Sequence, residues 1–214
     1  MAKIVRRKEG ASGPRRSSSW SARKRILDVA EDLIARDSPS DFQLQDVADR
    51  LGVKPPALYN HFRGREDLLQ QVDSRGSDGG YAALERAPEE DVLTWLRNSA
   101  RRLVAYYTSR PAIARFTLWD LARGQLASPS DADRKRFEDL MARVRSAIEQ
   151  AVHDGEVRRI RPDAFFLTLT SSIAASVLWH EFCPDEDIDI KHLEDEAESL
   201  VVRLLLPDSE DSGA

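Results

Sequence analysis

The stretch LGVKPPALYNHFRGREDLL, residues 51–69, places two adjacent prolines, Pro55 and Pro56, in a region that otherwise has helical character. Proline suits the first turn of a helix, because its missing N–H would have no partner there and its φ angle is already helical. The two prolines therefore predict that a short helix begins at residue 55. Gly64 predicts its end, and a longer helix is expected to start near Arg65.

Two helices are predicted before this short one. A stripe of apolar residues at helical spacing predicts an amphipathic helix that starts near Ser21 and ends at residues 38–40. The stripe consists of Ile26, Val29, Ala30, Leu33 and Ile34. A second short helix is expected from about Gln43 to Arg50, and Gly52 follows where a helix C′ residue belongs. This order of elements is typical of a helix-turn-helix, whose second short helix enters the DNA major groove by its N-terminal end.

The remainder of the chain predicts further helices and no strand of useful length. Apolar stripes predict helices at about 89–107, 111–126, 131–152, 162–182 and 192–206. The expected fold is therefore all-α, with a three-helix N-terminal domain and a larger C-terminal helical bundle. The expected domains are a disordered basic arm at 1–20, the helix-turn-helix domain at 21–72, the helical domain at 73–206, and a disordered acidic tail at 207–214.

Three glycines interrupt the stretch that should continue the fourth helix. They are Gly76, Gly79 and Gly80. Each glycine in a helix interior is less favourable than alanine by about 1 kcal/mol. The sequence therefore predicts a kink, a break or a flexible joint between the two domains.

The charge distribution separates the front of the chain from the rest. Residues 1–75 carry 15 Lys and Arg against 11 Asp and Glu, whereas the remaining residues carry 17 against 26. Nine of the basic residues precede Ile26. A basic arm before an acidic body fits a polyanionic partner for the N-terminal end, and a simple solvated tail is the alternative.

The cysteine count and hydropathy bear on the compartment. Cys183 is the only cysteine, so no internal disulfide forms, which fits a reducing cytoplasm. The first twenty residues lack the apolar core of a signal peptide, and no apolar run approaches the ~18 residues of a membrane span. We therefore expect a cytoplasmic protein with no membrane partner.

The stretches RILDVAEDLIARD, residues 25–37, and FQLQDVADRLGVKPPALYNHFRGREDLL, residues 42–69, resemble the DNA-binding domain of TetR-family transcriptional regulators. The matching residues are Ile26, Ala30, Leu33, Ile34, Val47, Ala48, Leu51, Gly52, Val53, Leu58, Tyr59, His61, Phe62, Leu68 and Leu69. The resemblance covers about residues 23–72 and implies a homodimeric, all-α regulator, in most members a repressor that a ligand in the C-terminal domain releases from operator DNA. Where the family often caps the second helix with Ser or Thr, this chain has Gln43, and Asp41 is a candidate substitute cap.

A set of residues around the second short helix is predicted to contact double-stranded DNA. The set is Gln43, Gln45, Lys54, Pro55, Pro56, Ala57, Tyr59, Asn60, His61 and Arg65. The hydroxyl of Tyr59 and the ring of His61 suit phosphate oxygens, and Arg65 adds charge at a helix N-terminus. Lys54 can donate to guanine and Asn60 can pair with adenine. The small apolar side chain of Ala57, between them in the sequence, can contact a thymine methyl group.

The alternative for the aromatic residues of this helix is a structural role. Leu58 and Phe62 are expected to close a small three-helix core. For Tyr59, His61 and Arg65 we favour contact with DNA, because polar tips on a positive short helix have little other use.

Large side chains on the long helices predict a pocket for a small effector. The predicted lining is Trp95, Tyr106, Tyr107, Phe116, Trp119, Met141, Phe165, Trp179 and His180. A cavity between helices, apolar with a few polar groups, is where a bundle binds small molecules, so the expected effector is apolar or aromatic. The alternative is that these residues form an ordinary packed core.

The helix at 162–182 is apolar nearly all round, so it must be buried on every side. One face can serve the core while another serves a partner. Together with the helix at about 191–206 it predicts a four-helix bundle across a two-fold axis. A central helix within a monomer is the alternative, and the resemblance favours the homodimer.

No catalytic site, cofactor or metal site is predicted, and an enzyme is not expected. His180 and Cys183 are three residues apart with Glu181 between them, which is not the two-histidine zinc spacing. The sequence has no nucleophile elbow and no phosphate loop. A zinc or redox sensor that uses Cys183 is the alternative.

The sequence as a whole predicts a DNA-binding transcriptional regulator, a homodimeric repressor released by a small apolar or aromatic effector. One alternative is a small-molecule-binding helical protein whose helix-turn-helix contacts another protein. A second is a DNA-binding activator or nucleoid-type protein without an effector, which predicts a filled core and no cavity.

Overall fold

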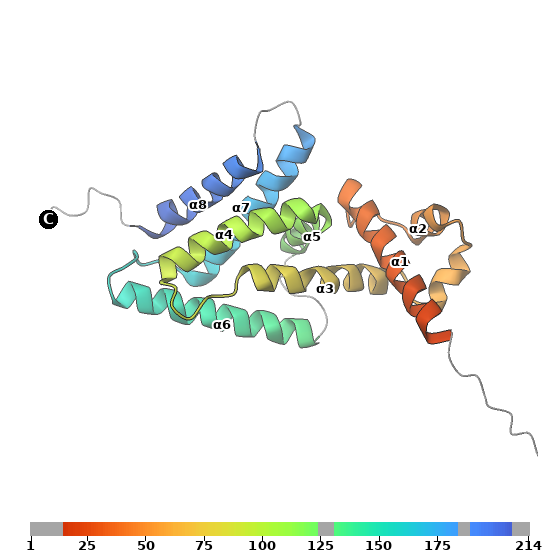
Figure 1. The fold of residues 1–214 in the computed structure, drawn as a ribbon, viewed down its shortest axis with the longest axis horizontal. Coiled ribbons are helices and arrows are strands. Elements are labelled where there is room, and N and C mark those ends of the chain that lie inside the picture. The colour runs from red at the N-terminus through yellow and green to blue at the C-terminus, as the bar shows by residue number, and fades with distance from the viewer. Residues whose placement is uncertain (1–14, 124–130, 184–188, 207–214) are drawn as a thin grey trace, which may run out of the picture.

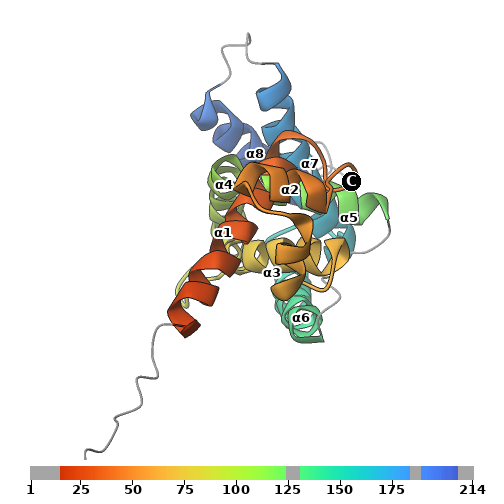
Figure 2. The same ribbon diagram turned by 90° about the vertical axis from the view of Figure 1, so that its right-hand side faces the viewer.

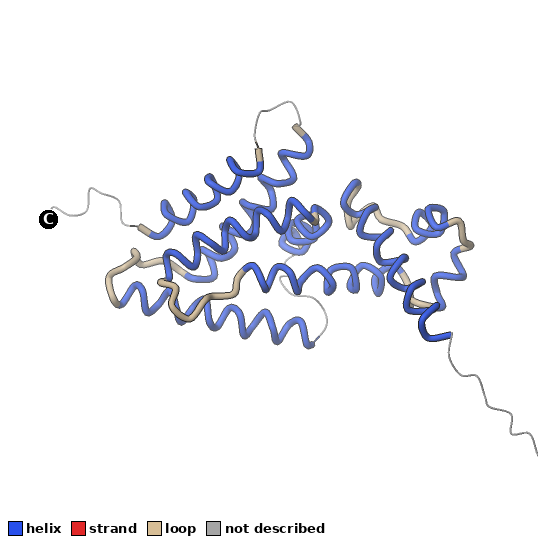
Figure 3. Tube along the Cα trace, in the orientation of Figure 1, coloured by secondary structure: helices blue, strands red, loops and turns tan. Residues whose placement is uncertain are grey.

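The computed structural model describes residues 15–123, 131–183 and 189–206, and every regular element in those ranges is a helix (Figure 3). The elements are α1 (Arg15–Arg36), α2 (Leu44–Leu51), the 3₁₀ helix η1 (Pro55–Asn60), α3 (Arg65–Ala83), α4 (Val92–Ser109), α5 (Pro111–Ala122), α6 (Asp131–His153), α7 (Pro162–Phe182) and α8 (Ile190–Leu205). The all-α prediction is therefore confirmed. The expected arm up to residue 14, the acidic tail from residue 207 and the expected helical turn after residue 123 lie outside the described residues.

The chain forms two groups of helices that α3 connects. Helices α1, α2 and η1 gather at one end of the molecule, and α3 runs from them into the larger bundle of α4–α8 (Figure 1). In both views α6 lies on one side of α3, and α7 and α8 lie on the other (Figure 2). Helix α1 begins at Arg15, before the apolar stripe that marks its buried face.

The local signals around α2 act largely as the sequence predicts. Gly52 ends α2 with φ +67°, a left-handed conformation that glycine adopts without strain. The N-cap is Gln43, and its N–H donates to the carboxylate of Asp46 at 3.2 Å. This reciprocal contact replaces the cap expected from Asp41.

Helix α3 runs without a break through its three glycines, so the predicted kink or joint is wrong. A Cβ on Gly76 would lie 2.1 Å from Cδ1 of Ile113, and a Cβ on Gly79 would lie 2.3 Å from the Tyr106 ring. The Tyr106 hydroxyl also donates to the carbonyl oxygen of Gly76. Glycine is present because α4 and α5 approach α3 closely, and this packing offsets the low helix propensity.

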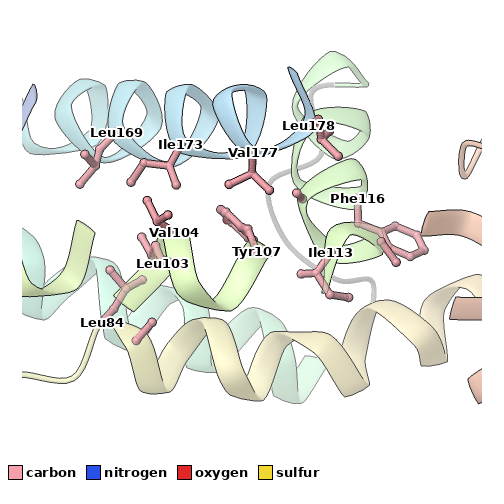
Figure 4. Close-up of a cluster of buried hydrophobic side chains, with 14 of the residues drawn as sticks. Leu84, Leu103, Val104, Tyr107, Ile113, Phe116, Leu169, Ile173, Val177 and Leu178 are labelled. Carbon is pink, nitrogen blue, oxygen red and sulfur yellow. The ribbon is translucent and has the colours of Figure 1, made fainter. Parts of the chain in front are cut away.

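The core of the bundle lies between α4, α5 and α7. Leu169, Ile173 and Val177 point from α7 toward Val104 and Tyr107 of α4 (Figure 4), and all five are buried. Helix α8 packs along α4 on the outside of this core (Figure 1).

Two aspartates set where helices begin in this bundle. Asp91 accepts a hydrogen bond from the N–H of Thr94 at 2.8 Å, so α4 begins after it rather than near residue 89. Asp189 does the same for the N–H of His192 at 2.7 Å, so α8 begins at residue 190. None of the helices in the described ranges is long and apolar enough to cross a membrane.

Ionic contacts join the two groups of helices. Arg110, between α4 and α5, donates from Nε and Nη2 to the two carboxylate oxygens of Glu31 on α1, each at 2.7 Å. Arg75 of α3 contacts Asp28 of α1 at 2.6 Å, and Nε of Arg115 donates to the carbonyl oxygen of Ala35 at 2.9 Å. The bidentate contact between Arg110 and Glu31 has a narrow geometry, so together with the other two contacts it fixes the orientation of α1 on the bundle.

Candidate DNA-binding surface and effector cavity

The short element η1 packs against the core of its domain on one side and is exposed to solvent on the other. Leu58 and Phe62 are buried, at 1% and 2% exposure, which confirms their predicted place in the core. Tyr59 is 58% exposed, so it does not close this core. Lys54 and Asn60 are also exposed. The three residues therefore present polar groups to solvent from an element that its buried residues hold in place.

Arg23 of α1 holds the end of this element in place. Its Nη1 donates to the carbonyl oxygen of His61 at 2.5 Å, and its Nη2 donates to the side chain of Gln71 on α3. Its guanidinium also lies over the Phe62 ring, 4.5 Å from the centroid. Although Arg23 is one of the basic residues expected in the arm, its contacts place it inside the domain as a positioning residue.

Arg65 begins α3, where the sequence places it, and its side chain makes several contacts within the protein. Its guanidinium donates to the carbonyl oxygens of Phe42 at 2.8 Å, Pro39 at 2.7 Å and Ser40 at 3.0 Å, and it pairs with Glu66 at 2.6 Å. Four of its five N–H donors are therefore used within the protein. This arrangement ties the segment before α2 to the start of α3, so Arg65 has a positioning role, and its contact with phosphate stays a prediction.

The other predicted contact residues lie on or beside the same surface. Pro56, Ala57, Gln43 and Gln45 are exposed, and Nε2 of Gln45 donates to Asp49 at 2.7 Å. The side chains that remain partly buried are those of Pro55 and His61.

Two basic residues of this surface escaped sequence reasoning. Arg50, at the end of α2, and Arg63, after η1, are exposed and have no ion pair within the described ranges. The sequence signal that could have identified them is their positive charge immediately beside the predicted helix-turn-helix. Arg63 lines the same surface hollow as Tyr59 and Asn60.

A cavity of about 140 Å³ lies in the C-terminal bundle, between α3, α4, α5, α6 and α7. Its polar and aromatic wall residues include Asp73, Ser77, Tyr81, Tyr106, Tyr107, Thr117, Asp120, Phe137, Phe166 and Thr170. The hydroxyls of Tyr107 and Thr117 lie 3.2 Å apart and bond to each other.

Comparison with known proteins identifies the N-terminal domain. Residues 26–72 match the family model described as bacterial regulatory proteins, tetR family. The N-terminal domain is therefore a TetR-family DNA-binding domain. A chain with this domain is a DNA-binding transcriptional regulator, and η1 lies within the matched residues.

Relatives of this TetR-family regulator match most of its length at low identity. The nucleoid occlusion factor SlmA of Marinobacter nauticus is 23% identical over 145 residues, which are 66% of this chain and 72% of that protein. The ketosteroid transcriptional regulator KstR2 of Mycobacterium tuberculosis has a similar structure, with a TM-score of 0.67, 16% identity, and coverage of 87% of this chain and 96% of that one. A TetR-family regulator from Marinobacter aquaeolei gives a TM-score of 0.67 at 17% identity, covering 90% and 100%. These structural similarities establish the shared fold.

Only Tyr106 and Tyr107, of the nine residues predicted to line the effector pocket of this TetR-family member, line the cavity. The buried residues Trp95, Phe116, Met141 and Phe165 belong to the packed core. Trp119 packs edge-on against the Phe116 ring, and Nε1 of Trp95 donates to the carbonyl oxygen of Leu84 at 3.1 Å. For these residues the packed-core alternative describes the structure.

The last two predicted pocket residues lie outside the cavity, near the end of α7. Trp179 is 61% exposed, and His180 has a buried Nδ1 without a hydrogen-bond partner among the described residues. Both belong to the surface that α7 shows to solvent.

The cavity of this TetR-family chain contains two carboxyl groups that sequence reasoning missed. Burial, together with the negative charges of Asp120 and Asp133, raises the pKa of Asp73 on α3 to about 7. Burial raises the pKa of Asp120 on α5 to about 6, against the opposing charge of Arg123. Within the described residues neither Asp73 nor Asp120 has a hydrogen bond or an ion pair to its carboxyl group.

Proposed function

We propose that this regulator is a homodimeric repressor that occupies operator DNA through η1 and leaves it when a small effector enters the cavity. The observation that carries the proposal is the presentation of Lys54, Tyr59 and Asn60 on an element that Leu58 and Phe62 anchor. Polar tips on a rigid support suit base readout, because bidentate contacts need fixed geometry.

The exposed side chains divide into two kinds of contact. Lys54 and Asn60 are proposed to read base edges, guanine and adenine respectively, and Ala57 to meet a thymine methyl. Tyr59 and Arg63 are proposed to bind phosphate oxygens, which position the protein without reading sequence.

The homodimer is proposed to form through α7 and α8. Trp179 and Phe182 at the end of α7 are 61% and 63% exposed, and Ile190 at the start of α8 is 44% exposed. Ala175 and Ser176, one turn before, are also exposed and are small enough for a second helix to approach closely. A two-fold pair would place two copies of η1 on successive major grooves, about 34–36 Å apart.

The route from effector to DNA is proposed to run through α4. Tyr106 lines the cavity and donates to the backbone of Gly76 in α3, and Arg110, one turn later, holds Glu31 of α1. An effector that displaces the Tyr106 ring would disturb both contacts. It would favour dimers in which the two recognition helices are wrongly spaced, which is a shift between two populations.

A second candidate is a DNA-binding protein of the nucleoid that acts without an effector. The relative named as a nucleoid occlusion factor favours it, at 23% identity. That candidate predicted a filled core, whereas the bundle contains a cavity of about 140 Å³, so we favour the effector-controlled repressor.

The experiment that tests the proposal is a titration of the purified chain with DNA fragments from the neighbourhood of its own gene, at two salt concentrations and with competitor DNA. The repressor proposal predicts a competitor-resistant complex of one dimer on a palindromic site. Lys54→Ala is expected to change the preferred bases, and Lys135→Ala, at an exposed lysine of α6, serves as the matched control. Binding that ignores sequence and disappears at moderate salt would reject the proposal, because it would reflect only the attraction of basic residues.

A further inference from the structure

The charged side chains in the described part of the cavity wall are all acidic. The wall contains the carboxyl groups of Asp73 and Asp120, from different helices, and no Lys, Arg or His side chain among the described residues. In the described part of its wall the cavity therefore has carboxyl groups on two sides and no basic side chain.

These carboxyl groups differ from the other buried acids of the described chain. Glu31 is held by Arg110, and Asp133 accepts a hydrogen bond from Ser74 at 2.8 Å. Among the residues that the structure describes, Asp73 and Asp120 have no such partner. Buried charge is unfavourable unless it is paired, so an unpaired carboxylate facing a cavity favours a ligand that supplies the missing positive charge.

Aromatic rings supply part of the rest of the wall, beside aliphatic and hydroxyl side chains. Tyr81, Tyr106, Phe137 and Phe166 border the cavity, and the last two rings pack edge to face with centroids 6.0 Å apart. The faces of such rings attract cations. A cavity of roughly 150 Å³ is large enough for benzene, so this one, at about 140 Å³, accommodates the body of a ligand with about one ring.

Other ligand classes fit these residues less well. A carboxylate or phosphate would meet two acids and no basic group in the described wall. A metal ion has no site either, because the described ranges contain no group of three His, Cys, Asp or Glu side chains placed to hold one.

We propose that the cavity binds an organic cation, an ammonium group on a small aromatic or apolar body, with Asp73 and Asp120 as its counter-charges. This inference rests on the proposed effector role of the cavity and adds a positive charge to the apolar or aromatic effector that the sequence suggested. The ammonium lies between α3 and α5, and the body lies among the rings from α4, α6 and α7.

Binding of the cation is coupled to a proton. The titratable groups around Asp73 are Tyr81 on its own helix, Tyr106 and Tyr107 on α4, Asp120 on α5, and Asp133 on α6. The guanidinium of Arg136 lies over the Tyr81 ring and pairs with Asp78. Helix α7 adds no titratable group to the described wall. Because burial and the two neighbouring acids raise the pKa of Asp73 to about 7, part of the population is protonated near neutral pH. A cation favours the ionised form, so its affinity increases from pH 6 to pH 8.

The test measures binding to the DNA-free protein by calorimetry and by the shift in melting temperature. The probes are 2-phenylethylamine, cyclohexylamine and benzyltrimethylammonium, compared with 2-phenylethanol and phenylacetate. We expect the cations to bind and the alcohol and the acid to bind far more weakly or not at all. The loss of a charge-assisted contact predicts a decrease in affinity of roughly 10- to 100-fold in Asp73→Asn and in Asp120→Asn.

The controls separate this inference from a structural effect. Asp78→Asn removes an exposed acid of the same helix outside the cavity wall and should leave amine affinity unchanged. Asp73→Asn should also reduce the rise in affinity between pH 6 and pH 8, which a merely structural change would not do. The inference is overturned if no cation binds at millimolar concentration, if the alcohol binds as tightly as the amine, or if both Asn variants bind amine normally.

The outcome also stays distinct from that of the repressor proposal. A cation that binds in the cavity and leaves the operator complex intact would support the inference and reject the effector mechanism. Operator binding with no affinity for any cation would support the repressor and overturn the inference.

Discussion

Gly79 and Gly80 are adjacent in α3, yet replacing each by alanine should change stability in opposite directions. A Cβ on Gly79 would lie 2.3 Å from Cε2 and 2.8 Å from Cζ of the Tyr106 ring, inside any acceptable contact. A Cβ on Gly80 would lie 3.8 Å from the same ring, an ordinary van der Waals distance. Both positions are helical, so both substitutions gain helix propensity, and only one of them collides.

The magnitudes follow from three contributions. Alanine improves helix propensity by about 1 kcal/mol at either position. At Gly79 overpacking costs about 1–3 kcal/mol, and moving the Tyr106 ring breaks its hydrogen bond to Gly76, which contributes about 1 kcal/mol more. The free energy of unfolding should therefore fall by about 1–3 kcal/mol in Gly79→Ala and increase by about 1 kcal/mol in Gly80→Ala.

Thermal and urea unfolding at one fixed protein concentration would measure both variants, since a dimer unfolds in a concentration-dependent way. For a chain of this size, 1 kcal/mol corresponds to about 2–4 °C, so the melting temperatures should differ by about 4–16 °C. If Gly79→Ala is as stable as Gly80→Ala, then close approach of Tyr106 is not the reason for glycine at this position, and the account of α3 given above is wrong.

Three further predictions follow from particular contacts. Arg65→Ala should lower the free energy of unfolding by about 1–3 kcal/mol, because it removes bonds to three loop carbonyls, and should leave the salt dependence of DNA binding unchanged; a smaller salt slope with normal stability would show instead that Arg65 binds phosphate. Asp73→Asn should stabilise the protein increasingly as pH rises from about 4 to 7, because the raised pKa of Asp73 makes the folded state bind a proton more tightly than the unfolded state; equal urea midpoints for variant and wild type across this range would contradict it. Trp179→Glu should yield a monomer in analytical ultracentrifugation with unchanged helical circular dichroism, and a persistent dimer would exclude Trp179 from the interface.

Local rules were sufficient to predict most helices. Pro55 and Pro56 marked the start of η1, Gly52 marked the end of α2, and the apolar stripes located the long helices. Prolines and C′ glycines act within one helical turn, so the helix ends that they mark can be predicted without knowledge of the fold. The buried positions of Leu58 and Phe62 were predictable for the same reason, because helical periodicity assigns a face.

The errors came from residues whose role depends on distant parts of the chain. Gly76 and Gly79 look like helix breakers until Ile113 and Tyr106, about 30 residues away, are placed against them. Most of the lining of the predicted cavity was missed similarly, because the large aromatic residues most visible in the sequence, Trp95 among them, are large enough to fill the core. A cavity remains where the packing of several helices leaves space, and no single stripe specifies that.

Tyr106 connects these observations. Its ring borders the cavity, its edge fits against Gly79, and its hydroxyl donates to the carbonyl oxygen of Gly76 in the helix that leads to the recognition element. Burial raises the pKa of its hydroxyl to about 12, so the group stays a neutral donor at any physiological pH. A ring held this tightly moves as a unit, and a ligand that pushes it must also push α3 or break the bond to it. In the proposed mechanism, the glycines of α3 are the positions where occupancy of the cavity becomes a displacement of the DNA-binding domain, because a larger side chain there would hold α4 away from α3.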